Sequence, residues 1–290
     1  MAEKGLIAVQ MMMLREKVEQ DGAYEVLKKL AELGFHGVEI SQIPMTPENV
    51  AEIKRACEDF DIEVVAGSAA LEGADRENLT DHFDKIVADM KTLNCNFLRI
   101  GMLPIEGMSS KEVALEFIAR MEEKAKALAE HGIDLYYHNH HVEFAKYDGK
   151  YLLDIIRDNT ETIGFEIDVH WVHRGGENPV TYLENFKGRL KLLHLKDYRV
   201  VPVKPVEADP SDSPQVKRQK FQQAFNSVVQ FAEIGEGSLN FPAIIQAGLD
   251  AGSEYFIIEQ DDRYGRDVYE ALTISRDNLY KMGYKSWFTR

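Results

Sequence analysis

Four segments of this chain carry imidazole and acidic residues where an apolar run ends. They are Tyr136–Phe144 (YYHNHHVEF), Phe165–Trp171 (FEIDVHW), Leu192–Asp197 (LLHLKD) and Ile257–Asp261 (IIEQD). Each apolar run has the length of a buried strand. If these strands run parallel in one sheet or barrel, their carboxyl ends converge on one face and the polar side chains become neighbours.

The chemistry that such a cluster favours is binding of a divalent metal. Carboxylates that are packed together repel one another, and a cation relieves that repulsion. Glu143, Asp168, His194 and Glu259 would form an oxygen-rich shell with one imidazole. That shell suits Mn²⁺ or Mg²⁺, with Co²⁺, Fe²⁺ or Zn²⁺ as alternatives, and the lack of thiolates argues against a structural zinc site.

Each of these residues also has an ordinary structural interpretation. A single acidic residue at a strand end is more often a helix N-cap or a solvated loop residue than a ligand. The cluster His138–His141 could be a hydrogen-bonded structural patch, and Lys196 could form a buried ion pair with Glu166 or another carboxylate instead of contacting substrate. Four consecutive strands that all end in ligand-type residues favour the functional interpretation.

The elements that would position these residues alternate between strand and helix along the chain. The pattern predicts strands over 6–13, 37–40, 63–69, 96–103, 133–140, 163–169, 190–195 and 255–259, and helices that include 24–33, 47–60, 76–93, 111–131 and 267–282. Eight such units without an interdomain linker predict an α/β fold, a single-domain (β/α)8 TIM barrel over residues 1–290. A doubly wound sheet is disfavoured because no glycine-rich nucleotide motif follows the first strand.

One segment interrupts this rhythm directly after the seventh strand. Residues 198–236 contain four prolines and a helical stretch over 215–232. Functional loops of a barrel lie at this end, so the insertion is a candidate lid, an oligomer contact or a decoration without function.

Composition limits the classes of partner and the location. The chain has 290 residues, with 34 basic against 49 acidic side chains and a formal net charge of −15. An acidic surface repels nucleic acid and anionic membranes. No run of eighteen apolar residues and no secretory signal is apparent, and two distant cysteines fit free thiols, so we expect a cytoplasmic protein.

In its motifs the chain resembles the sugar phosphate isomerase/epimerase superfamily of xylose isomerase-like barrels, which includes the AP endonuclease 2 family. The resemblance spans nearly the whole chain and rests on GFHGVE at 34–39, HNHHVEF at 138–144, Asp168 with Trp171 and Gly175-Gly176, HLKD at 194–197, GEG at 235–237 and EQD at 259–261. It implies a metal held by Glu143, Asp168, His194 and Glu259. In ketose 3-epimerases the two metal-bound glutamates also move the substrate proton.

The resemblance also implies roles for the remaining residues. Ketose 3-epimerases have a histidine where this chain has Trp171, and the histidines of 138–141 look closer to inosose dehydratase-like and keto-glycoside-processing relatives, in which a histidine acts as base. The candidate proton-transfer residues are Glu143, Glu259, His140 and His141. Lys196 would contact a substrate oxygen, and the other candidate substrate contacts are Trp171, Glu236, His138 and His170.

The function expected from these residues is isomerisation or epimerisation of a sugar or keto-sugar through an enediolate, in a homo-oligomeric enzyme. A lyase of the same superfamily, dehydrating an inosose or eliminating a keto-glycoside, is the alternative. An endonuclease IV-like phosphoesterase or a non-catalytic carbohydrate-binding protein fits less well, because neither a larger histidine-rich ligand set nor basic DNA-binding loops are evident.

Overall fold

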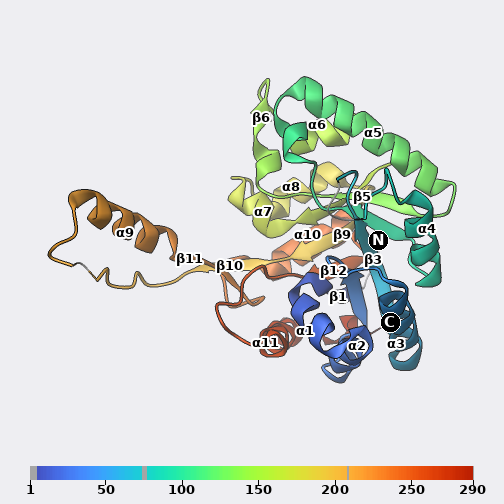
Figure 1. The fold of residues 1–290 in the computed structure, drawn as a ribbon, viewed down its shortest axis with the longest axis horizontal. Helices are drawn as coiled ribbons and strands as arrows, with labels where there is room; N and C mark the ends of the chain where they lie inside the picture. Colours follow the sequence, from blue (N-terminus) through green and yellow to red (C-terminus); the bar gives the residue numbers. More distant parts are fainter. Residues whose placement is uncertain (1–4, 74–76, 208, 290) are drawn as a thin grey trace.

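Eight parallel strands close into a barrel in the computed structural model, which describes residues 5–73, 77–207 and 209–289 (Figure 1). The order around the barrel is β1-β12-β9-β8-β5-β4-β3-β2, with β1 paired to both β12 and β2. The predicted TIM barrel is therefore confirmed. The barrel strands are β1 Leu6–Gln10, β2 Gly37–Ile40, β3 Glu63–Ala69, β4 Phe97–Ile100, β5 Asp134–His138, β8 Gly164–Asp168, β9 Leu190–Leu195 and β12 Tyr255–Ile258.

Helices cover the outside of the barrel wall (Figure 1). Their starts follow capping chemistry: the Thr46 hydroxyl accepts a hydrogen bond from the Asn49 amide at the start of α3, and the Ser110 hydroxyl accepts one from the Val113 amide at the start of α5. The helices are α1 Arg15–Asp21, α2 Ala23–Glu32, α3 Pro47–Phe60, α4 Phe83–Thr92, α5 Lys111–Ala129, α6 Leu152–Asp158, α7 Val169–Arg174, α8 Pro179–Tyr182, α9 Pro214–Asn226, α10 Phe241–Ala251 and α11 Val268–Lys281, with short 3₁₀ turns η1 Met11–Leu14, η2 Ile105–Met108, η3 Val142–Phe144, η4 Leu183–Phe186 and η5 Lys285–Trp287.

The interior of the barrel changes from apolar to polar along β5, β9 and β12. Alternate residues of a strand face opposite sides, and Leu193 and Leu195 belong to the large apolar core between wall and helices. The intervening position Leu192 belongs to a second apolar cluster with Tyr136, Tyr255 and Ile257. Farther along the same strands this inner side carries polar groups, so the carboxyl end of the barrel is the end that can do chemistry.

Two predicted elements near the N-terminus are shorter than expected. The first strand ends at Gln10, whose side chain accepts a hydrogen bond from the Met12 amide and starts a 3₁₀ turn. The helix expected over 76–93 begins only at Phe83. The reason is that the Asn78 side chain accepts hydrogen bonds from the Thr80 and Asp81 amides, which stabilises a turn in place of the first helical residues. Residues 74–76 lie outside the described part of the chain.

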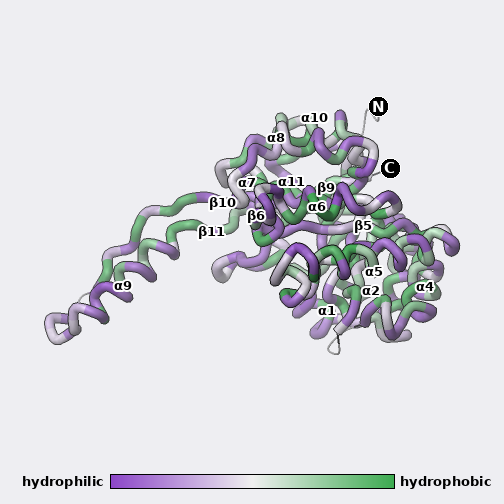
Figure 2. The backbone as a smooth tube through the Cα atoms, turned by 90° about the horizontal axis from the view of Figure 1, so that it is seen from above, coloured by the Kyte–Doolittle hydropathy of each residue, from purple (hydrophilic) through white to green (hydrophobic). Residues whose placement is uncertain are grey.

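The insertion after β9 is an arm, which we define as residues 197–232. Its two sides pair antiparallel near the barrel as β10 (Asp197–Val200) and β11 (Val229–Ala232), and α9 lies between them in the sequence. The helix predicted to reach residue 232 was wrong there, because the last four residues form a strand. The arm projects well away from the barrel (Figures 1 and 2).

No helix among the described residues is long and apolar enough to cross a membrane. Both cysteines are free thiols, with Cys95 buried and Cys57 half-buried.

Candidate metal centre

Four ligand-type side chains from four strands meet at the carboxyl end of the barrel. His138 ends β5, Asp168 ends β8, His194 lies in β9 and Glu259 follows β12. All four are buried, and one ligand atom from each lies within 4.8 Å of those of the other three. The strand ends predicted to converge do converge, but the imidazole of His138 stands where the sequence suggested Glu143. The cluster can hold a divalent metal.

The His138 ring is oriented as a metal-binding imidazole would be. Its Nδ1 lies 3.1 Å from the Gly101 carbonyl oxygen and donates to it, which leaves a lone pair on Nε2. Nε2 is buried and has no hydrogen-bond partner among the described residues. Burial is the main cause that lowers the pKa of His138, which favours the neutral ring at neutral pH. A buried, unpaired lone pair of this kind is suited to a metal ligand.

The two carboxylate oxygens of Asp168 have different roles: one caps helix α7, and the other belongs to the candidate ligand cluster. Oδ1 accepts the amides of His170 at 2.9 Å and Trp171 at 3.3 Å, and so caps α7. Oδ2 lies 3.7 Å from His138 Nε2 and 3.0 Å from Lys196 Nζ. The helix cap therefore fixes the carboxylate and directs its second oxygen into the cluster, where it pairs with a cation.

His194 connects the cluster to a second layer of charge. Its Nδ1 lies 2.7 Å from Glu259 Oε2, and its Nε2 lies 2.8 Å from Glu39 Oε2. A carboxylate on the far nitrogen orients the imidazole of many metal sites. Burial lowers the pKa of His194, but the carboxylates of Glu166, Glu39 and Glu259 raise it well above the ordinary value. A metal bound to His194 would therefore replace one ring proton and one of these two carboxylate contacts.

Arg99 from β4 supports this second layer. Its guanidinium donates to Glu39 Oε1 at 2.9 Å from Nε and 2.8 Å from Nη2, and Nε lies 3.1 Å from Glu166 Oε2. Burial, then the charge of Glu39, raises the pKa of Glu166 to about 7. Arg99 thus neutralises part of a buried acidic pair directly behind His194.

Lys196 provides the second fixed positive charge, in an ion pair with partners other than Glu166. Its Nζ lies 3.0 Å from Asp168 Oδ2, 3.0 Å from Glu259 Oε2 and 3.0 Å from Asp261 Oδ2. Burial lowers the pKa of Lys196, but these three carboxylates raise it above the ordinary value. The interpretation of Lys196 as a buried ion pair is therefore supported by its contacts, and its ammonium shares oxygens with the candidate ligand set.

Glu143 is not brought together with the other three predicted ligands. It lies in the 3₁₀ turn after β5, where Oε1 accepts the Tyr137 hydroxyl at 2.7 Å and Oε2 accepts the His140 amide at 2.8 Å. Burial raises the pKa of this carboxyl. Both oxygens are used to hold the loop that carries His140.

Aromatic and imidazole rings form one wall of the site. The Trp171 ring lies 5.6 Å from the His140 ring, 5.0 Å from the His141 ring and 4.6 Å from the His170 ring, between centroids. Lys196 Nζ lies 5.0 Å from the Trp171 centroid. His170 is buried, whereas His141 is exposed at the edge. These four predicted residues are thus neighbours of the cluster.

Glu236, a predicted substrate contact, lies in a turn beside α11. It is exposed, and its Oε1 accepts from Asn278 Nδ2 of α11 at 2.9 Å. The surrounding turn is held by Asp197, whose carboxylate accepts five backbone amides, at 2.8 to 3.2 Å, from Tyr198, Gly235, Gly237, Ser238 and Leu239. The GEG sequence is therefore explained by this turn.

Asp197→Ala is expected to lower the free energy of unfolding by about 2–4 kcal/mol, because it removes the acceptor of five amides. Urea unfolding at neutral pH measures the change. The matched control is Asp262→Ala, which removes the acceptor of one amide, that of Tyr264. Equal losses in the two variants would contradict this account of the turn.

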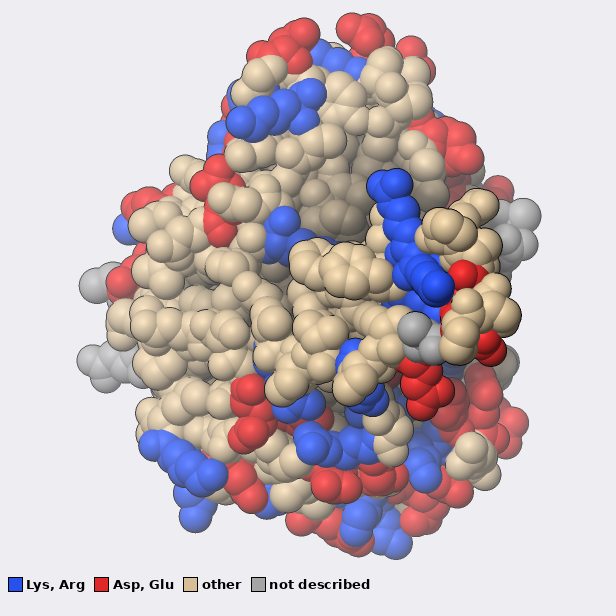
Figure 3. Space-filling model, turned by 90° about the vertical axis from the view of Figure 1, so that its left-hand side faces the viewer, with Lys and Arg blue, Asp and Glu red and all other residues tan. Residues whose placement is uncertain are grey.

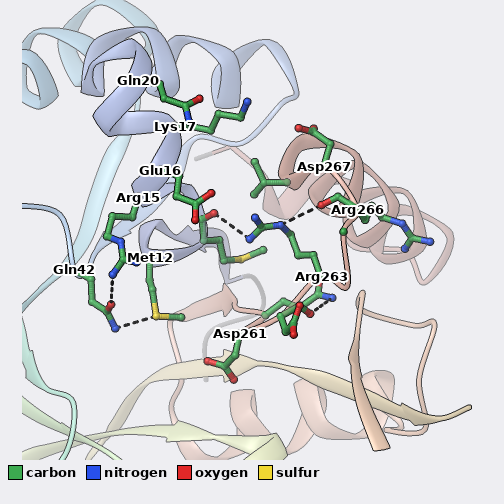
Figure 4. Close-up of a pocket in the computed structure, with 15 residues that line it drawn as sticks. Met12, Arg15, Glu16, Lys17, Gln20, Gln42, Asp261, Arg263, Arg266 and Asp267 are labelled. Carbon is green, nitrogen blue, oxygen red and sulfur yellow. Dashed lines mark hydrogen bonds between the residues drawn. The ribbon is translucent and has the colours of Figure 1, made fainter. Parts of the chain in front are cut away.

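A groove of about 700 Å³ opens beside the charged network (Figure 4). One side is formed by η1 and α1, and the other by the loop after β12. Figure 4 shows Asp261 in the same cavity as the charged side chains Arg15 and Glu16 of α1. Because Asp261 also contacts Lys196, the groove reaches the charged network from outside.

Sequence reasoning gave no role to three residues of this network: Glu39, Arg99 and Asp261. Glu39 and Arg99 stand between apolar neighbours in the short strands Val38-Glu39-Ile40 and Leu98-Arg99-Ile100. A charge flanked by buried apolar residues on a barrel strand faces the barrel interior, so this alternation was the available signal.

Comparisons with known proteins agree on the architecture. The family model described as xylose isomerase-like TIM barrel matches residues 27–283. Among curated proteins, no sequence matches this chain. A sugar phosphate isomerase/epimerase from Parabacteroides distasonis has a TM-score of 0.73 at 18% identity, covering 96% of this chain and 98% of that one.

Two other solved structures have similar values. A probable 3-DHS dehydratase, AsbF, from Bacillus anthracis has a TM-score of 0.67 at 13% identity, covering 95% of this chain and 98% of that one. The IOLI protein with a binding zinc atom has a TM-score of 0.67 at 14% identity, covering 98% and 100%. At these identities the likenesses show a shared fold.

Proposed function

Since this chain belongs to the xylose isomerase-like TIM barrel family, we propose that it is a divalent-metal-dependent isomerase or epimerase of a small sugar or keto-sugar. The proposed reaction is proton transfer next to a carbonyl group. The proposal extends to a cytoplasmic, homo-oligomeric enzyme that does not bind nucleic acid.

The observation that carries the proposal is an excess of negative charge around the cluster. Five carboxylates, the two permanent cations Arg99 and Lys196, and His194 form one contact network, in which the carboxylates outnumber the cations even when His194 is protonated. The five carboxylates belong to Glu39, Glu166, Asp168, Glu259 and Asp261. Charges withdrawn from water are stable only when they are compensated. A divalent cation held by His138, Asp168, His194 and Glu259 would offset most of the remaining charge.

The donor set also bears on which metal is bound. Two imidazoles and two carboxylates make a softer shell than the single-imidazole set expected with Glu143. Imidazole suits Zn²⁺ and Fe²⁺, whereas the two carboxylates also suit Mn²⁺. We therefore propose Mn²⁺ or Zn²⁺ ahead of Mg²⁺. That the similar IOLI structure holds zinc is consistent with this order.

When bound, such a metal would polarise a carbonyl oxygen and make the neighbouring C–H more acidic. The residues of the chain supply the remaining functions. His140 is the first candidate for proton transfer, since its Nδ1 is buried without a hydrogen-bond partner among the described residues. Glu259 is the second candidate, and its two oxygens contact Gln10, His194 and Lys196. Lys196 would donate to a substrate oxygen, and Trp171 would cover one face of the sugar.

A lyase of the same superfamily is the second candidate, and the position of Glu143 favours it. An epimerase that uses two glutamates needs both carboxylates at the substrate, whereas both Glu143 oxygens are hydrogen-bonded within its own loop. A histidine acting as the single base is sufficient for elimination of a β-hydroxyl or β-glycosyl group. The similarity in fold to the probable dehydratase from Bacillus anthracis is compatible with this reaction.

The first test of the function is metal removal. Turnover of ketoses and keto-sugars is expected to fall to background after treatment with EDTA and to return with Mn²⁺ or Zn²⁺. The reason is that removal of a proton next to the carbonyl group would depend on a metal that polarises the carbonyl oxygen. Activity that persists with less than one tenth of an equivalent of metal, measured by elemental analysis, would refute the metal dependence.

A second experiment separates the two reactions. Proton NMR in D₂O with the metal-loaded protein follows exchange at the carbon next to the carbonyl. Exchange with an epimeric or isomeric product and no released fragment supports the isomerase or epimerase. Release of water or an aglycone with a new absorbance from an unsaturated product supports the lyase.

A further inference from the structure

The arm carries most of the large apolar side chains that the protein exposes. Ten such side chains are exposed among the described residues, and six belong to the arm: Val200, Val203, Val206, Phe221, Phe225 and Val229. Phe221 and Phe225 are each 61% exposed. Isolated exposed apolar residues are ordinary, but their concentration on one projecting segment marks an interaction surface.

The helix at the end of the arm has no core of its own to pack against. None of the residues of α9 (Pro214–Asn226), all of which the structure describes, is buried. Phe221 and Phe225 lie one turn apart on the same face, with ring centroids 6.1 Å apart. An isolated helix of this length is marginal in water, so a partner that covers this apolar face would stabilise the helix.

The charge of the arm helix is opposite to that of the whole protein. Within α9 the charged residues are Lys217, Arg218 and Lys220, all basic, whereas the chain carries −15. Lys220 pairs with Asp212 at 2.6 Å, while Lys217 and Arg218 form no ion pair within the described residues. Figure 3 faces the side on which the arm projects and shows blue basic side chains among uncharged ones there, with acidic side chains spread around this face.

We propose that the arm docks on a second copy of this chain and forms a two-fold homodimer. The apolar face of Phe221 and Phe225 packs on the partner, and Lys217 and Arg218 face its acidic surface. Each copy offers both the basic helix α9 with its apolar face and an acidic remainder of the chain, so one two-fold axis satisfies both arms at once. The arm stretches away from its own barrel (Figure 2), and its helix reaches a neighbour more readily than its own core.

An anionic membrane is the competing partner for a basic helix that exposes phenylalanines. It fits less well because a protein with a net charge of −15 is repelled by such a surface. The exposed valines also lie along both sides of the arm, at 200–206 and at 229, in addition to the helix.

Docking of the arm would also steady the site. Tyr198 of β10 and Phe231 of β11 pack on His170, with ring centroids at 5.2 Å and 5.1 Å. The base of the arm thus forms part of the aromatic wall, so dimer formation restrains a wall of the candidate active site. The dimer specifies the homo-oligomer proposed above and does not depend on which reaction the enzyme catalyses.

Sedimentation velocity tests the dimer directly. The wild-type protein at about 20 µM is expected to sediment with twice the chain mass of 33.0 kDa, and Phe221→Ser/Phe225→Ser with the mass of one chain. Lys217→Glu/Arg218→Glu is expected to weaken association at least tenfold. The matched control Ile105→Ser removes an exposed apolar side chain (74% exposed) off the arm and should leave the dimer intact.

Loss of the dimer can be distinguished from a folding failure, because Phe221 and Phe225 do not pack on the hydrophobic core. The melting temperature of the monomeric variant should therefore match that of the wild type when both are diluted until they are monomeric. A wild-type protein that is monomeric at this concentration would overturn the proposal. So would arm variants that remain dimeric, or a monomer that co-sediments with phosphatidylserine vesicles through the two phenylalanines.

Discussion

Asp168→Asn is expected to reduce turnover by at least about 100-fold, and to weaken divalent-metal affinity by a similar factor, since even changes to partners of metal ligands cost about 10- to 100-fold. The substitution keeps the side-chain shape. Its Oδ1 can still accept the His170 and Trp171 amides that start α7. What it removes is the negative charge on the oxygen that faces His138 and Lys196.

Isothermal titration with Mn²⁺ or Zn²⁺, together with the turnover assay, measures both effects. Asp134→Asn is the matched control, because Asp134 is an exposed residue at the opposite end of β5. A variant at Asp168 that binds metal and turns over substrate like the wild type would remove the central ligand from the site and refute the proposed metal centre.

Lys196→Met is expected to lower the free energy of unfolding by about 3–5 kcal/mol in the presence of EDTA, because it leaves three carboxylates without their buried counter-ion. The side chain is 1% exposed, so solvent screens little of this charge. A divalent cation can replace the lost positive charge. We therefore expect saturating Mn²⁺ to raise the melting temperature of this variant by more than it raises that of the wild type.

Differential scanning calorimetry with and without metal measures both parts of this prediction. Lys191→Met is the control on the same strand, where the lysine is 37% exposed and pairs with Glu254, and its cost should stay below about 1 kcal/mol. A Lys196 variant that is equally destabilised with and without metal would show that the ammonium and the metal do not share these carboxylates.

The barrel strands β5 and β8 show which parts of the candidate site could be predicted from the sequence and which could not. HNHHVEF contains both His138 and Glu143 within one short segment. Sequence spacing cannot decide which of them faces the barrel axis, because that depends on where β5 ends. The strand stops at His138, and the following 3₁₀ turn directs Glu143 to Tyr137. Asp168, in contrast, ends its own strand and could be placed directly.

The sequence by itself determined the order of strands and helices and the polar character of the last four strand ends, because alternation and capping are local properties. Only the tertiary structure decided that Glu39 and Arg99 stand behind His194. They come from β2 and β4, which are far from β9 in sequence, and closure of the barrel brings their inward side chains together. The projection of the arm was likewise decided only by the tertiary structure, because the sequence pattern of α9 is the same whether the helix packs on the barrel or projects from it.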